Sequence, residues 1–364
     1  MDKITQGLKM KRFGYLYEKI YAWENLLLAY KKARKGKHGE ATDDFYNDWE
    51  RKLYEIQQAL ESETFRFGSY RQFKIYEPKE RLITAAPFCD RVVHHAICNV
   101  ILPILDKPLI VDSYACRINK GLHKAVKRAF YFYKNTQFHY SLDISKYYYS
   151  IDHEILKTLL KKKFKDVKLL NLLFLQIATY SGGAEYYQAF EGDDLFDMIR
   201  DRGLPIGNLT SQLWANYYLS GIDHFIREKL HFTNYVRYMD DMLVFGNDRS
   251  ELKQGRDKII SELSRLRLHI NPKKDCIQSN KHGVDFLGFR LFGKRIKIRT
   301  QNLVRFRRKL ALKSKNPHTD LKKLLRSFNG HLGYLLGGHT KRICNEVLSK
   351  IEFRTGNKHW KLVV

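Results

Sequence analysis

The sequence has few cysteines, and none is spaced for a zinc site. The five cysteines are odd in number, scattered and never in a Cys-x-x-Cys pair. This pattern is typical of buried thiols in a reducing compartment and argues against a disulfide framework. The N-terminus lacks the apolar core of a signal peptide, and no run approaches the roughly 18 apolar residues of a membrane span. We therefore expect a cytoplasmic protein with no membrane partner.

Acidic residues are scarce relative to basic ones. The chain has 39 Asp and Glu against 66 Lys and Arg, which gives a formal net charge of +27. The excess is uneven, because residues 292–364 contain 19 Lys or Arg and three Asp or Glu. Such a balance favours a polyanionic partner, and nucleic acid is the first candidate.

The hydrophobic pattern predicts a folded chain of mixed α+β class. Its 44% hydrophobic and 13% aromatic content argues against disorder, and 364 residues suffice for two or three subdomains. Helical spacing alternates with strand-like stretches that are not sequential repeats of one unit. The predicted helices lie within 15–63, 88–105, 152–164, 208–230 and 251–268 and from 303 onward; the predicted strands lie within 66–87, 136–143 and 284–300, with a hairpin over 235–246.

Two adjacent aspartates stand between two apolar runs in "NYVRYMDDMLVFG", residues 234–246. Burying Asp240 and Asp241 side by side is costly unless a cation meets them. A solvated hairpin turn is the simple alternative. Asp143 ends the strand "FHYSLD" and can supply a third carboxylate. Three carboxylates on neighbouring strands suit two-metal phosphoryl transfer, in which the cations lie about 3.5–4 Å apart.

Other aspartates fit structural roles better. The pair Asp193 and Asp194 lies in the polar stretch "EGDDLFD" without flanking apolar strands, which predicts a plain loop. Asp152 precedes a predicted helix, so we interpret it as a helix N-cap.

Several motifs occur in an order that resembles reverse transcriptases. "LDISKYYYSID", "GLPIGNLTSQLWANYYL" and "YMDD" resemble the palm motifs, and "KERLITAAPFCDRVVHHAI" and "DSYACRINKGLHKA" resemble the finger motifs of group II intron-like enzymes. "LRLHINPKKD" and "FLGFRL" resemble the motifs after the hairpin, so the resemblance covers about 65–291. "IGNLTSQ" and the opening "WENL…AY…K…GK" are similar to reverse transcriptases of diversity-generating retroelements.

The resemblance implies a right-hand polymerase fold. It places an N-terminal helical segment at 1–64, fingers at 65–135, a palm at 136–291 with a finger insertion at about 153–203, and a basic helical thumb at 292–364. The implied reaction is RNA-directed DNA synthesis with two Mg²⁺ ions, which Mn²⁺ can replace. The implied partners are template RNA, the RNA/DNA hybrid, deoxynucleotides and, in the diversity-generating type, a small basic oligomeric accessory protein. A phage-defence reverse transcriptase with a dedicated noncoding RNA, and an RNA-binding scaffold without catalysis, remain alternatives.

The resemblance also implies roles around the incoming nucleotide. Tyr148 stands where this class places an aromatic ring under the sugar, which would exclude a 2′-hydroxyl; a core aromatic is the alternative. Arg81 would bind the triphosphate through its planar fork. Lys79 and Arg117 are weaker candidates, and a solvated surface charge is the alternative for all three.

Further positions concern fidelity, primer and duplex. Ile206 replaces a glutamine that accurate relatives usually have before Gly207; the alternative is that Ile206 only fills an apolar gap and that errors arise elsewhere. Gly207 would let the backbone approach the template and nucleotide closely; a turn before a helix is the alternative. Phe286, Leu287 and Gly288 would grip the primer end. The cationic face of the thumb would follow duplex phosphates. Its candidate residues are Arg305, Arg307, Arg308, Lys309 and Lys313.

Overall fold

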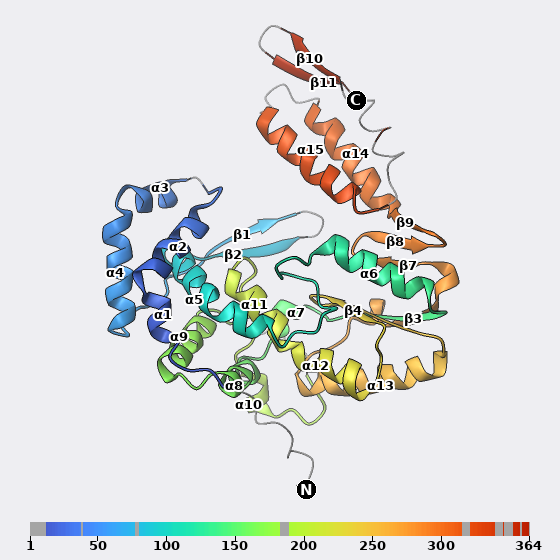
Figure 1. Cartoon of the computed structure of the whole chain (residues 1–364), viewed down its shortest axis with the longest axis horizontal. Coiled ribbons are helices and arrows are strands. Elements are labelled where there is room, and N and C mark those ends of the chain that lie inside the picture. Colours follow the sequence, from blue (N-terminus) through green and yellow to red (C-terminus); the bar gives the residue numbers. More distant parts are fainter. Residues whose placement is uncertain are drawn as a thin grey trace. The chain divides into compact units, whose positions relative to one another are not determined.

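The computed structural model describes residues 12–37, 39–76, 80–182, 189–314, 321–338, 345, 352–356 and 359–363 (Figure 1). The chain forms two compact units. The first unit comprises Met1–Val111, Ile144–Lys229 and Asp257–Asn271, and the second comprises Asp112–Asp143, Leu230–Arg256 and Pro272–Val364. The chain therefore crosses between the units five times. The predicted boundaries of fingers, palm and thumb are not tested by this division and stay a prediction.

Helices dominate the N-terminal part of the first unit, as predicted. They are α1 (Tyr17–Tyr21), α2 (Trp23–Arg34), α3 (Glu40–Asn47), α4 (Trp49–Glu61) and α5 (Phe88–Asp106). Helix α2 buries Leu26, Ala29, Tyr30 and Ala33, and this three-to-four-residue spacing places one apolar face against α5. By length and composition alone α5 could cross a membrane, contrary to the expectation from the sequence, but 56% of it is buried, as in a core helix.

A β-hairpin and seven further short or medium-length elements belong to the first unit among the described residues. Strands β1 (Arg71–Ile75) and β2 (Arg81–Ala85) are antiparallel, as predicted. The single long helix predicted over 208–230 is wrong, because it divides at Leu219, just before the pair Ser220–Gly221; such pairs weaken the helical ladder. The remaining elements are α7 (Tyr147–Ser150), α8 (His153–Lys163), α9 (Val167–Ala178), α10 (Leu195–Met198), α11 (Leu209–Tyr218), α12 (Ser220–His224) and a π-helical turn at Phe225–Lys229.

A four-stranded antiparallel sheet forms the centre of the second unit. Its order is β4 (Tyr235–Tyr238), β5 (Asp241–Gly246), β3 (Phe138–Asp143) and β6 (Cys276–Ser279). The predicted strand at 136–143 and the hairpin at 235–246 are confirmed, whereas β6 was not predicted. Helix α6 (Leu122–Lys134) packs on β4 and β5. Helix α13 (Arg249–Arg265) follows the hairpin and continues into the first unit.

A second sheet of this unit carries the C-terminal helices. Strands β7 (Val284–Phe286), β8 (Phe289–Phe292) and β9 (Arg295–Ile298) share one hydrophobic core with Phe306 and Leu335 of helices α14 (Thr300–Ser314) and α15 (Leu321–Leu335). The tail predicted as helical ends instead in an antiparallel hairpin, β10 (Glu352–Gly356) and β11 (His359–Val363). The two strands contain the aromatic residues Phe353 and Trp360 and the β-branched residues Thr355 and Val363, which favour strands.

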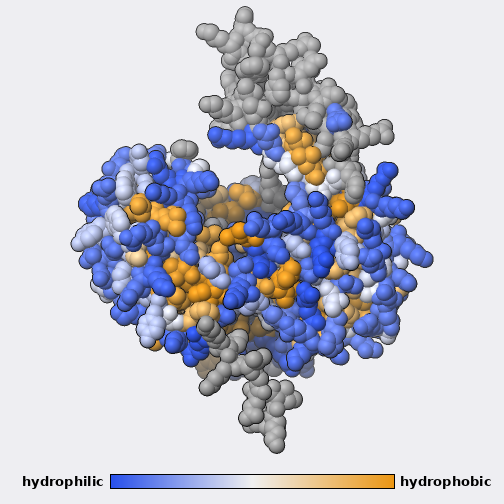
Figure 2. All heavy atoms as spheres, in the orientation of Figure 1, coloured by the Kyte–Doolittle hydropathy of each residue, from blue (hydrophilic) through white to orange (hydrophobic). Residues whose placement is uncertain are grey.

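Polar groups cover most of the face shown in Figure 2, in keeping with the basic composition. The mixed α+β class is confirmed. The cysteines differ from the expectation of buried thiols. All four described cysteines are free, but Cys98 alone of them is buried and Cys116 is exposed, whereas Cys344 lies outside the described residues.

Candidate active site

The sheet of the second unit brings Asp143 and Asp241 into direct register. Asp143 is the last residue of β3, Asp241 is the first residue of β5, and the two are antiparallel partners. Asp240 and Met239 form the turn between β4 and β5, with Met239 in the left-handed region at φ 57°. Because residues on paired strands alternate faces, a register shift of one residue would separate Asp143 from Asp241. The structure therefore places the three predicted carboxylates at one end of one sheet.

A lysine that the sequence analysis missed meets two of these carboxylates. The Nζ atom of Lys274 lies 3.1 Å from Asp143 Oδ1 and 2.9 Å from Asp241 Oδ1. Lys274 ends a short 3₁₀ turn, Pro272–Lys274, that precedes β6. Burial lowers the pKa of Lys274, but the charges of Asp241 and Asp143 and the hydrogen bonds to them outweigh it and raise the pKa. Two carboxylate oxygens thus converge on one cationic point.

Asp240 is the third carboxylate of this group, and its pKa is also shifted. Burial, followed by the charges of Asp143 and Asp241, raises the pKa of Asp240 to about 7. Burial also raises the pKa of Asp241. Within the described ranges, no three His, Cys, Asp or Glu side chains are arranged around a common metal position. The donor set nevertheless fits a hard divalent cation, because it consists of carboxylate oxygens and two of them already share one cation.

A buried arginine supports the turn that carries Asp240. Arg237 in β4 is fully buried, and its Nη1 donates to the carbonyl of Met239 at 3.2 Å. Its backbone pairs with the carbonyl of Asp112 and the N–H of Tyr114, each at 3.0 Å. The Asp112 carboxylate is buried and meets the guanidinium of Arg128 at 2.9 Å. A charged residue within the apolar strand "YVRY" was the sequence signal for this support.

Four of the candidates for nucleotide binding lie in the first unit on connected backbone: Arg81, Tyr148, Ile206 and Gly207. The Thr84 N–H donates to the carbonyl of Ile206 at 2.9 Å, and the Leu204 N–H donates to the carbonyl of Tyr148 at 2.7 Å. Strand β2, which begins at exposed Arg81, and the segments around Tyr148 and Ile206 are therefore fixed to one another. Tyr148 and Ile206 are both half-buried.

Gly207 sits where a side chain would collide with this backbone. Its φ is 131°, and a Cβ atom would lie 2.9 Å from the carbonyl oxygen of Thr84. The neighbouring Tyr147 is 2% exposed and belongs to the core, whereas Tyr148 is not fully buried. Arg117 belongs to the second unit, where its Nη1 donates to the carbonyl of Ser113 at 3.0 Å. Lys79 lies outside the described residues.

The primer-grip candidates form a tight turn between β7 and β8. Leu287 and Gly288 have φ of 49° and 83°, and Phe286 is buried in the core. The carbonyl of Gly288 accepts hydrogen bonds from the Arg299 N–H at 3.1 Å and from Asn302 Nδ2 at 3.2 Å. The Tyr334 hydroxyl donates to the carbonyl of Leu287 at 3.3 Å. Helices α14 and α15 therefore clamp this turn.

The basic face of α14 lies opposite a buried residue. Arg305, Arg307 and Arg308 are exposed, whereas Phe306 between them is 4% exposed. Lys309 and Lys313 lie on the same helix, but their side chains are outside the described residues. An amphipathic helix of this kind presents cations to solvent and keeps its apolar side in the core.

The other aspartates have structural partners. Asp152 caps α8 by accepting from the Ile155 N–H at 2.9 Å, as predicted, and also binds Arg200 through two hydrogen bonds of 2.7 and 2.9 Å. Asp193 forms a two-point ion pair with Arg267 at 2.7 and 2.9 Å, so its loop is more ordered than a solvated one.

Comparisons with known proteins agree with the motif order. The sequence model of the family described as reverse transcriptase (RNA-dependent DNA polymerase) matches residues 75–291. The group II intron-encoded protein LtrA of Lactococcus lactis is 26% identical over 210 residues, which cover 56% of this chain and 33% of LtrA. An uncharacterized 91 kDa protein in the cob intron of Schizosaccharomyces pombe is 29% identical, covering 47% of this chain and 20% of that protein. This chain thus spans about a third or less of these relatives.

A solved structure of telomerase from Candida tropicalis, in complex with a fragment of telomeric RNA, is also similar. It shares 12% identity and a TM-score of 0.49, and the overlay covers 74% of this chain and 53% of the telomerase chain.

Proposed function

Because the chain belongs to the reverse transcriptase (RNA-dependent DNA polymerase) family, we propose that it extends a 3′-hydroxyl with deoxynucleotides under the direction of an RNA template. The observation that carries the proposal is the register of Asp143 with Asp241, beside Asp240 in the adjoining turn. This arrangement concentrates negative charge at one sheet end, where phosphoryl-transfer enzymes hold cations.

Asp143, Asp240 and Asp241 would hold two Mg²⁺ ions, for which Mn²⁺ can substitute. When bound, such ions activate the attacking hydroxyl and stabilise the leaving pyrophosphate. The contribution of the protein is to hold the carboxylates in place before the substrate arrives. The antiparallel pairing fixes Asp143 and Asp241, and the hydrogen bond from Arg237 to Met239 supports the turn that carries Asp240.

The finer assignment is an error-prone enzyme of a diversity-generating retroelement. Its support is the sequence "IGNLTSQ", in which Ile206 stands where accurate relatives usually have glutamine. The proposed partners are a template RNA, its RNA/DNA hybrid, deoxynucleotides and a small basic accessory protein, in the cytoplasm of the host. The net charge of +27 supports a nucleic-acid partner.

The test is primer extension on an RNA template by Asp240→Asn and Asp241→Asn variants. Loss of a carboxylate charge at these positions should abolish extension while RNA binding measured by filter retention persists. Asp194→Asn is the matched control, because Asp194 caps α10 and asparagine caps helices equally well. Extension by the double variant at the rate of the parent would refute the assignment.

A further inference from the structure

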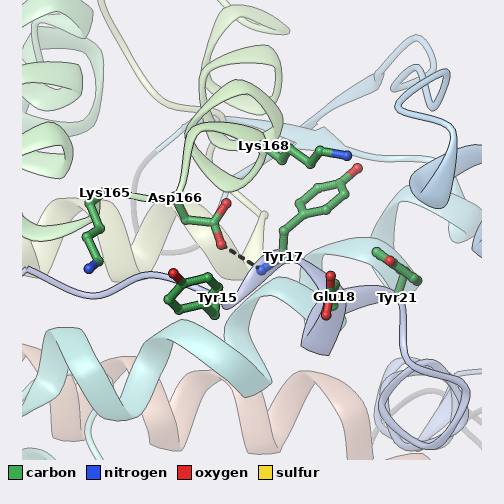
Figure 3. Close-up of a pocket in the computed structure, with 7 residues that line it drawn as sticks. All are labelled: Tyr15, Tyr17, Glu18, Tyr21, Lys165, Asp166 and Lys168. Carbon is green, nitrogen blue, oxygen red and sulfur yellow. Dashed lines mark hydrogen bonds between the residues drawn. The ribbon is translucent and has the colours of Figure 1, made fainter.

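The first unit contains a pocket remote in sequence from the catalytic motifs. It has a volume of about 380 Å³, within the range of about 300–1,000 Å³ usual for ligand sites. One wall comes from the segment before α1 and from α1 itself, and the other comes from the segment before α9 and from the first turn of α9 (Figure 3). Three tyrosines and two lysines line it, together with two carboxylates.

Backbone pairing joins the two walls. The Phe13 N–H donates to the carbonyl of Lys163 at 2.9 Å, and the Lys165 N–H donates to the carbonyl of Phe13 at 2.8 Å. The Asp166 carboxylate accepts from the backbone N–H groups of Leu16 at 2.7 Å and Tyr17 at 3.0 Å. Burial raises the pKa of Asp166, but the hydrogen bonds from the backbone outweigh burial, and the net effect is a lowered pKa. The charged carboxylate is therefore engaged by the wall of the pocket itself. The pocket is therefore built before any ligand arrives.

Tyr15 is the least expected residue of the pocket. It is 87% exposed and has a φ of 56°, a conformation that is strained for an aromatic residue. Because the Tyr15 side chain is exposed, packing in the core does not compensate for this strained backbone conformation. Strained residues are found most often at functional sites. The Nζ atom of Lys165 lies 5.8 Å from the centre of the Tyr15 ring, and the lysine stem lies against Gly14. An aromatic face and an ammonium group thus stand together at the rim.

The remaining groups differ in how far they are engaged. Lys168 forms an ion pair with Glu63 at 2.9 Å. The Tyr17 hydroxyl donates to the carbonyl of Leu60, and the Tyr17 ring contacts that of Tyr21 edge-on. Glu18 is exposed on α1 and faces the same pocket.

We propose that this pocket binds one nucleotide of an unpaired nucleic-acid strand, which for a chain that copies RNA is the single-stranded template. The base stacks on Tyr15, its phosphate lies against the ammonium of Lys165, and the carboxylate of Glu18 accepts from an amino group of the base. Cytosine, adenine and guanine carry such a group and uracil does not. The proposal rests on the proposed RNA partner but not on catalysis.

The experiment measures binding of fluorescent single-stranded oligo(C) and oligo(U) RNA, six nucleotides long, to the full chain by anisotropy. Tyr15→Ala should weaken oligo(C) binding about tenfold, since stacking on one aromatic ring gives roughly five- to hundredfold in affinity. Tyr54→Ala is the matched control, because Tyr54 is a 56% exposed tyrosine on α4 that does not line the pocket. Lys165→Gln, which keeps most of the stem over Gly14, should weaken both oligonucleotides.

A second readout locates the contact. Ultraviolet cross-linking of a 5-iodocytidine RNA oligonucleotide, followed by peptide mass spectrometry, should identify Tyr15 as the cross-linked residue. Equal affinities of the parent and Tyr15→Ala, or cross-links confined to other segments, would overturn the proposal. Primer extension distinguishes the failure of this proposal from the failure of the proposed function. If Tyr15→Ala extends primers and binds RNA as well as the parent does, only the nucleotide-binding role of the pocket is refuted. If the parent chain does not extend primers but its Tyr15 still cross-links to RNA, only the polymerase assignment is refuted.

Discussion

Gly288→Ala tests whether helices α14 and α15 determine the shape of the predicted primer grip. Gly288 has a φ of 83°, and a Cβ atom there would overlap the Tyr334 hydroxyl and lie 2.5 Å from Asn302 Nδ2. Both side chains donate to carbonyls of the same turn. Alanine would therefore displace the two groups that hold the turn in place.

The magnitude follows from two separable costs. An alanine in the left-handed region costs about 1–2 kcal/mol. Loss of two hydrogen bonds adds about 0.5–1.5 kcal/mol each. Gly293→Ala is the matched control, because Gly293 lies in the turn between β8 and β9 with a φ of 55° and nothing within 4 Å of its Cβ position. The control should lose only the free energy that the left-handed conformation costs. The free energy of unfolding of Gly288→Ala should therefore be lower than that of the control by about 1–3 kcal/mol, the contribution of the two hydrogen bonds.

Thermal unfolding and primer extension together form the assay. The difference should lower the unfolding midpoint of Gly288→Ala below that of Gly293→Ala by about 2–4 °C for each kcal/mol. Because the turn carries the predicted primer contact, the KM for primer–template should rise in Gly288→Ala and stay unchanged in the control. Equal midpoints and equal KM values in the two variants would show that neither Tyr334 nor Asn302 constrains the turn.

Three further predictions concern selectivity and binding. Tyr148→Val should admit ribonucleotides while deoxynucleotide use persists, since the ring would no longer obstruct a 2′-hydroxyl; unchanged discrimination in single-nucleotide extension would return Tyr148 to a packing role. Charge reversal at Arg305 and Arg308 should flatten the salt dependence of RNA binding, by about 0.9 in log–log slope for each lost phosphate contact, and an unchanged slope would remove α14 from the interface. Ile206→Gln should lower misincorporation opposite template adenine, because glutamine can hydrogen-bond near the nascent pair and each 1.4 kcal/mol of discrimination is about tenfold in error frequency. Deep sequencing of cDNA checks this, and equal error rates at adenine would exclude Ile206 from fidelity.

The aspartate hairpin could be predicted because its signal is local. Apolar runs on both sides of Asp240 and Asp241 define two strands, and a two-residue turn between them leaves few registers. The placement of Asp143 on a neighbouring strand could also be predicted, since the stretch "FHYSLD" is typical of a strand and ends in a carboxylate, whereas its direct pairing with Asp241 was not predicted. Element boundaries were less well predicted. The helix break at Leu219 depends only on the following residues Ser220 and Gly221, which weaken a helix slightly. The hairpin of β10 and β11 was not predicted, because the basic charge of the tail was interpreted as one face of a helix.

Contacts between distant segments lay beyond the sequence signal. Lys274 lies in the motif "LRLHINPKKD", but it is one of many lysines in a chain with 66 basic residues, and the motif alone did not indicate a contact with the aspartates. Its role depends on β6 adding to the sheet beside β3, a pairing that links residues far apart in the chain. Arg237 was visible as a charge within an apolar strand, but its partner Met239 became clear only with the conformation of the turn.

The charges at this end of the sheet explain the adjacent aspartates Asp240 and Asp241. A single ammonium group, that of Lys274, contacts Asp143 and Asp241 and can offset at most one of three negative charges. Burial, followed by the charges of Asp143 and Asp241, raises the pKa of Asp240 to about 7. A fold selected for stability alone would replace such a cluster, because buried like charges oppose folding. The rigid register and the buried support of Arg237 instead hold the carboxylates together, so the sheet retains an arrangement that additional positive charge would stabilise.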